Sequence, residues 1–111
     1  VAQVVHALQV AGAMPEERVL STFEMPYAYH TNYDFRPLAT GLMPDDLPAY
    51  LESEEARFLL VEEMYGARYW PQLAALLAPN GDQGSPPRGL ELTWLQDKPR
   101  VVLYRVRTGE Q

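Results

Sequence analysis

The chain lacks cysteine altogether and has only two histidines among its 111 residues. Without cysteine it forms no disulfide bond and offers no thiolate to a metal. The two histidines, His6 and His30, lie far apart in the sequence and do not form a ligand set with a recognisable spacing. We therefore expect no metal site and no cofactor. The absence of cysteine does not indicate a compartment, because proteins of reducing and of oxidising compartments can both lack it.

Basic residues are scarce: nine Lys and Arg stand against 15 Asp and Glu, which gives a net charge of −6. A surface that binds phosphate groups needs a surplus of Lys and Arg. The charge therefore argues against nucleic acid as a partner, and equally against docking on an anionic membrane leaflet. Its simplest consequence is solubility.

Long apolar runs are also missing, since no stretch reaches the roughly 18 residues that span a bilayer. The apolar fraction of 47% is nevertheless sufficient for a hydrophobic core. We expect residues 1–107 to form a single domain and residues 108–111 to form a tail. The helical pattern is already present at Val1, and no signal-peptide pattern precedes it. We therefore expect this domain to have been excised from a longer protein.

No motif for catalysis or nucleotide binding is visible. The segment after the first predicted strand reads STFEMPY and has no glycine, whereas a phosphate-binding turn needs several. Ser21 does not lie in the G-x-S-x-G turn that exposes a nucleophile. The adjacent acidic pairs do not form obvious acid–base dyads, because neighbouring residues of a strand point to opposite faces. We expect no catalytic residue in this chain.

Hydrophobic periodicity divides the chain into alternating helical and extended segments. Apolar residues spaced three and four positions apart predict helices, whereas short β-branched runs bounded by proline or glycine predict strands. We predict helices over residues 1–11, within 25–36, from Asp45 or Asp46 onward and over 70–77, and strands over 18–23, 36–40, 57–61, 90–96 and 100–107. The Pro/Gly-rich stretch 78–89 is predicted to be a loop.

This order predicts an α/β fold. Strands that alternate with helices form βαβ units, whose strands lie parallel in a sheet covered by helices. The last two strands are separated by Asp97-Lys98-Pro99, which is typical of an antiparallel hairpin. We therefore expect a small, mostly parallel sheet flanked by helices, with a C-terminal antiparallel hairpin.

Aromatic residues gather after the first and third predicted strands. In an open parallel sheet, ligands bind beyond the carboxyl ends of the strands. Aromatic faces beside a carboxylate and an arginine suit a sugar or an extended polar acceptor. The residues that we expect to bind substrate are Tyr27, Tyr29, His30, Tyr33, Arg36, Glu62 and Tyr65. The alternative is that these rings cap the core or pack on a neighbouring domain.

Four stretches follow the leading helix: RVLSTF, YAYHTNYDFRP, DDLPAYLESEEARFLLVEE and PPRGLELTWLQDKPRVVLYRV. Their order resembles the soluble C-terminal domain of membrane-embedded, polyprenyl-phosphate-sugar-dependent glycosyltransferases, relatives of the dolichyl-phosphate-mannose–protein mannosyltransferases. The resemblance covers nearly the whole chain and includes no catalytic motif.

The resemblance implies a non-catalytic accessory domain on the extracytoplasmic face of a membrane, either periplasmic or at the cell surface. Its partner would be the transmembrane portion of the same polypeptide, together with a glycan or acceptor that it helps to position. Two alternatives remain open from the residues alone: a small-molecule-binding or regulatory α/β module, and a structural protein-interaction domain.

Overall fold

The computed structural model describes residues 2–22, 33–39, 41–63, 70, 76, 89–97 and 100–107. Its elements are α1 (Ala2–Val10), β1 (Arg18–Ser21), β2 (Asp34–Pro37), the short 3-10 helix η1 (Pro44–Asp46), α3 (Leu47–Ser53), β3 (Phe58–Glu62), β4 (Leu90–Gln96) and β5 (Val101–Val106). The α/β class predicted from the sequence is confirmed. The described residues contain no helix that is long and apolar enough to span a membrane.

The strands form one five-stranded sheet in the order β2-β1-β3-β5-β4. β1 pairs parallel with both β2 and β3, whereas β5 pairs antiparallel with both β3 and β4. The sheet is therefore mixed rather than mostly parallel. β4 and β5 do form an antiparallel pair, but β5 also lies directly against β3, so the hairpin continues the sheet and its core.

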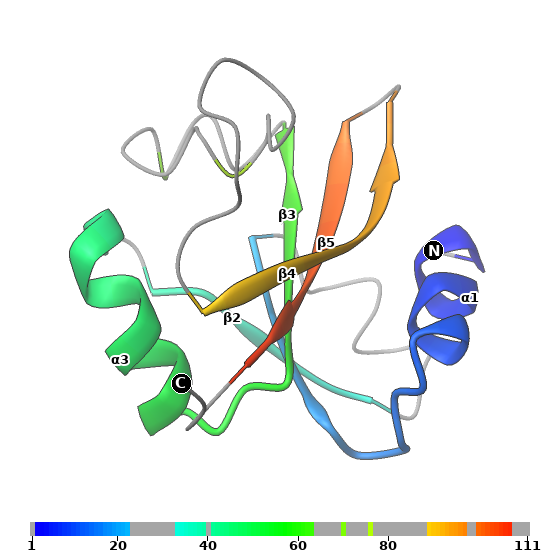
Figure 1. The fold of residues 1–111 in the computed structure, drawn as a ribbon, viewed down its shortest axis with the longest axis horizontal. Helices are drawn as coiled ribbons and strands as arrows, with labels where there is room; N and C mark the ends of the chain where they lie inside the picture. Colours follow the sequence, from blue (N-terminus) through cyan, green and yellow to red (C-terminus); the bar gives the residue numbers. More distant parts are fainter. Residues whose placement is uncertain are drawn as a thin grey trace.

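Helices α1 and α3 lie on opposite sides of this sheet (Figure 1). Successive residues of each central strand alternate between two buried clusters, as the period of two in a strand requires. On β1, Val19 belongs to the α1 side and Leu20 to the α3 side; on β5, Leu103 and Tyr104 divide in the same way. β1 and β5 are thus covered on both faces, which explains why each contains consecutive buried apolar residues.

Helices α1 and α3 both end in a Schellman motif. After α1, the amide of Gly12 donates to the carbonyl of Gln9 and the amide of Ala13 to that of Leu8, with Gly12 at a φ of 86°. This is the Schellman arrangement, in which a residue with positive φ follows the helix. The guanidinium of Arg105, which lies 5.4 Å from the centre of the Phe58 ring, also donates to the carbonyl of Ala11. α1 is thus fixed to β5 at its C-terminal end.

Helix α3 begins directly after Asp45 and Asp46, where the sequence predicts the start of a helix. Asp46 is the N-cap residue, but its side chain makes no capping hydrogen bond, because its backbone has already turned into the helical region through η1. Pro48 lies in the first turn, where its missing amide removes no hydrogen bond. Leu47 and Leu51 are the buried residues of the helix.

The second predicted strand needs a correction. The sequence predicts a short helix or turn within residues 25–36 and a strand over 36–40, whereas the observed strand is Asp34–Pro37. Only Phe35 of its four residues is buried, so the segment lacks the apolar run that reveals a strand in a sequence. The predicted helix over 70–77 and the loop 78–89 lie mostly outside the described residues.

Candidate functional site

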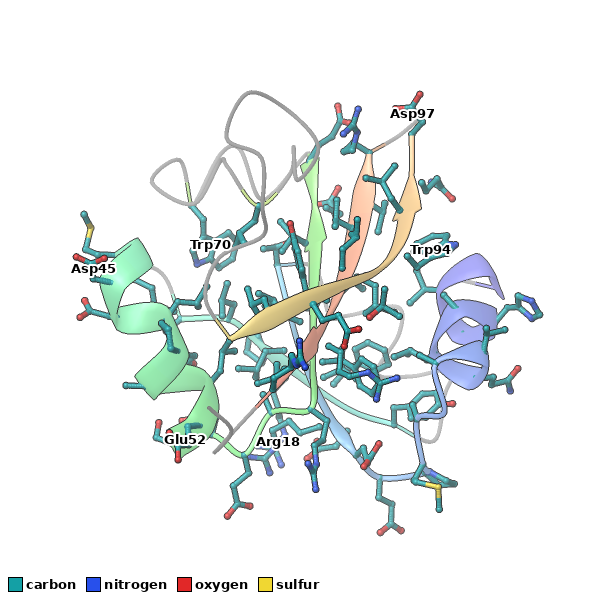
Figure 2. The ribbon with its side chains drawn as sticks, viewed as in Figure 1. Arg18, Asp45, Glu52, Trp70, Trp94 and Asp97 are labelled. Atoms are coloured by element: carbon teal, nitrogen blue, oxygen red, sulfur yellow. The ribbon has the colours of Figure 1, made fainter. Side chains whose placement is uncertain are left out.

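The three parallel strands define two rims of the sheet. We call the side at which β1, β2 and β3 end the carboxyl rim, and the side at which they begin the amino rim. The five residues of β3 separate the two rims by roughly 13–16 Å. Figure 2 shows Arg18 and Glu52 at one end of the molecule and Asp97 at the other.

The carboxyl rim brings together the ends of β1 and β3, as the sequence predicts. The amide of Glu62 donates to the hydroxyl oxygen of Thr22 at 3.0 Å, and the amide of Thr22 donates to the carbonyl of Leu60 at 3.1 Å. Thr22 is 8% exposed, so its hydroxyl stabilises the junction between the two strands. A carboxylate oxygen of Glu63 accepts from the amide of Arg100 at 2.6 Å, which connects the same rim to the start of β5.

The seven residues predicted to bind substrate do not all lie at this rim. Glu62 lies there, at the end of β3. Tyr33 directly precedes β2 and packs its ring edge-to-face on Phe35 at 6.4 Å, so it lies at the amino rim. Four members, Tyr27, Tyr29, His30 and Tyr65, lie outside the described residues.

Arg36 also points away from the predicted site. Its Nε donates to a carboxylate oxygen of Asp34 at 2.7 Å, and Asp34 is the first residue of β2. The prediction from the sequence places Tyr33 and Arg36 together with Glu62, because it takes residues 25–36 to form one loop beyond β1. Since β2 begins at Asp34 and runs parallel to β1, the chain has returned to the amino rim by Tyr33.

The amino rim carries an open hollow of about 480 Å³. Three segments line it: the turn before β1, the first residue of β2, and the end of α3 with the turn into β3. The lining residues are Glu16, Glu17, Arg18, Asp34, Glu52, Glu55, Ala56 and Arg57. Five carboxylates and two guanidinium groups thus meet in one depression.

Arg18 is the central ion-pairing residue of this hollow. Its Nε donates to a carboxylate oxygen of Asp34 at 3.0 Å, and its Nη1 donates to the main-chain carbonyl of Glu54 at 2.8 Å. It therefore connects β1 to β2 and also satisfies a carbonyl at the C-terminal end of α3, where a cation is favourable. The hydrogen bond from Arg36 is the main cause that holds the pKa of Asp34 below its ordinary value, and the hydrogen bond from Arg18 acts in the same direction.

The other charged residues of the hollow form longer ion pairs or none within the described residues. Arg57 lies 3.7 Å from the nearest carboxylate oxygen of Glu17, and its side chain is 58% exposed. Within the described part of the chain, Glu16, Glu52 and Glu55 make no ion pair. The lining thus has an excess of negative charge that the arginines do not neutralise.

Two of these glutamates occupy backbone positions that favour glycine. Glu55 has a φ of 59° and follows α3 in a Schellman motif, in which its own amide donates to Glu52 and that of Ala56 donates to Leu51. Glu16 has a φ of 73° in a turn closed by the amide of Glu17 and the carbonyl of Met14. With proline at the second position, this is the pattern of a type II turn, whose third position usually holds glycine.

Comparison with protein families, with curated proteins and with solved structures found no match to this chain. The chemistry of the site therefore follows from its own residues. Within the described ranges, no group of three or more His, Cys, Asp or Glu residues is placed to hold a metal ion, despite the many carboxylates of the amino rim. Carboxylates that outnumber the arginines beside them offer hydrogen-bond acceptors to cationic groups.

Sequence reasoning missed the amino rim. From the sequence, the adjacent acidic pairs, among them Glu16/Glu17 and Glu54/Glu55, are not expected to form acid–base dyads. The signal that indicates a turn is Pro15, which suits the second position of a type II turn. The turn is difficult to recognise in the sequence because glutamate, rather than glycine, occupies its position with positive φ.

Proposed function

We propose that this chain is a non-catalytic, extracytoplasmic accessory domain of a membrane-embedded, polyprenyl-phosphate-sugar-dependent glycosyltransferase. The observation that carries the proposal is the order of the segments that resemble such domains. RVLSTF contains β1, YAYHTNYDFRP contains β2, and DDLPAYLESEEARFLLVEE contains α3 and β3. The last stretch contains the hairpin of β4 and β5. Each stretch thus contains at least one described helix or strand.

In this proposal the domain packs against the transmembrane portion of the same polypeptide and helps to position the acceptor or glycan. The proposed contact residues are Glu62, at the end of β3, and the aromatic residues Tyr27, Tyr29 and Tyr65, which lie outside the described residues. The net charge of −6 supports a partner other than nucleic acid.

The experiment is a transfer assay on the full-length protein in membranes, with one variant for each rim. Glu62→Gln removes a charge at the carboxyl rim without changing the shape of the side chain, and Glu52→Gln does the same at the amino rim. Arg107→Gln is the control, since it alters an exposed residue after β5. The amount of folded, membrane-associated protein is measured in parallel.

We expect Glu62→Gln to lower sugar transfer by about tenfold, which corresponds to about 1.4 kcal/mol, while Arg107→Gln leaves it unchanged. Loss of transfer in Glu52→Gln alone would move the acceptor site to the amino rim and leave the accessory role standing. If deletion of the whole domain leaves both transfer and assembly unchanged, the accessory role is wrong.

The hollow favours a second candidate, a small-molecule-binding module. Its volume falls in the range of about 300–1,000 Å³ that is common for ligand sites. Its excess of carboxylates suits a ligand with amino groups. The check is a nuclear magnetic resonance titration with spermidine at constant ionic strength, comparing the native chain with Glu52→Gln and, as control, Glu91→Gln. Saturable shifts at the amino rim that disappear in Glu52→Gln support this candidate, and shifts that follow ionic strength alone exclude it.

A further inference from the structure

We draw no further inference here: the strongest candidate, the acidic hollow at the amino rim between the start of β1 and the end of α3, belongs to the site already described, and no buried unpartnered group in the described part of the chain points to a ligand there beyond its exposed carboxylates.

Discussion

The hydroxyl of Tyr104 donates a hydrogen bond of 2.6 Å to the main-chain carbonyl of Leu76. Both residues are buried, at 0% and 2% exposure, on the α3 side of the sheet. The indole of Trp70 makes a similar contact, donating to the carbonyl of Ala39 at 2.7 Å. Two aromatic side chains thus satisfy main-chain carbonyls that the sheet does not pair.

We predict that Tyr104→Phe lowers the free energy of unfolding by about 1–3 kcal/mol, because it leaves the buried carbonyl of Leu76 without its hydrogen bond. Urea denaturation monitored by tryptophan fluorescence measures the change. Tyr50→Phe is the matched control: Tyr50 is only half-buried and its hydroxyl makes no hydrogen bond within the described residues, so the effect stays below about 0.5 kcal/mol. Equal losses in both variants would show that the Tyr104 hydrogen bond contributes nothing specific.

The same residue makes stability sensitive to alkaline pH. Burial raises the pKa of Tyr104 to about 12 from an ordinary value of 10.0. Because the folded state holds this proton more tightly than the unfolded state, the contribution is complete below pH 10 and is lost as the pH rises towards 12. We expect the stability difference between the native chain and Tyr104→Phe to shrink over this interval. A difference that stays constant from pH 8 to 11 would contradict the assignment.

Glu55→Gly is predicted to stabilise the chain by about 0.5–1 kcal/mol. Glycine has no side-chain penalty at positive φ, and this gain exceeds the added freedom of the unfolded chain. Gly12 occupies the equivalent position after α1, so Gly12→Ala serves as the reciprocal control and is expected to destabilise by a similar amount. Thermal unfolding by circular dichroism measures both. If Glu55→Gly destabilises the chain, the Glu55 side chain makes a contribution that its exposed position does not explain.

Asp34→Asn is predicted to lower stability by about 1 kcal/mol at neutral pH and low salt, since Asp34 is paired with Arg18 and Arg36 in a partly exposed site. The pKa of Asp34 lies below its ordinary value of 3.8. The stabilisation is therefore complete above that value and is lost as the pH falls through the lowered pKa. Urea unfolding of both proteins over a series of pH values from 7 downward follows this loss.

Asp97→Asn provides the comparison for Asp34→Asn. Asp97 also forms an ion pair, with Arg100 at 2.9 Å, but its side chain is 68% exposed. We expect an effect smaller than about 0.3 kcal/mol. If the two asparagine variants lose the same free energy at pH 7, the ion pairs that connect β1 and β2 have no special role in this fold.

Much of the fold could be predicted because its strongest local patterns are also its buried segments. Residues 57–61 read as a strand because four consecutive apolar side chains enter two clusters on opposite faces of the sheet. The periodicity of residues 1–11 gave α1 because Val4, Ala7 and Leu8 share one buried face. In both segments the apolar residues that form the sequence pattern are the residues that are buried, so the pattern predicts the element.

The antiparallel pairing of β5 with β4 was predicted from the sequence, but its pairing with β3 could not be predicted in the same way. A run such as VVLYRV shows that a strand is buried, but not which neighbour it pairs with or in which direction. β5 lies antiparallel to β3 as well as to β4, and its pairing with β3 depends on contacts between residues some 40 positions apart. The mixed character of the sheet is therefore a tertiary property.

The candidate site was predicted least well, because the position and direction of the short strand β2 could not be predicted from the sequence. Phe35 alone marks β2 as buried, and its polar neighbours Asp34 and Arg36 resemble loop residues. Once β2 lies parallel to β1, Tyr33 lies at the amino rim and the Arg36 side chain reaches back to Asp34, whereas Glu62 lies at the carboxyl rim. A ligand that contacts all three would have to span both rims.

The central claim, an accessory domain of a multi-pass membrane glycosyltransferase, is tested most directly by reading the native coding sequence upstream of Val1. The account predicts several apolar segments of about 20 residues each, enough to cross a bilayer repeatedly. An initiating methionine just before Val1, or an upstream region without such segments, would contradict the claim and leave the hollow at the amino rim as the remaining candidate site.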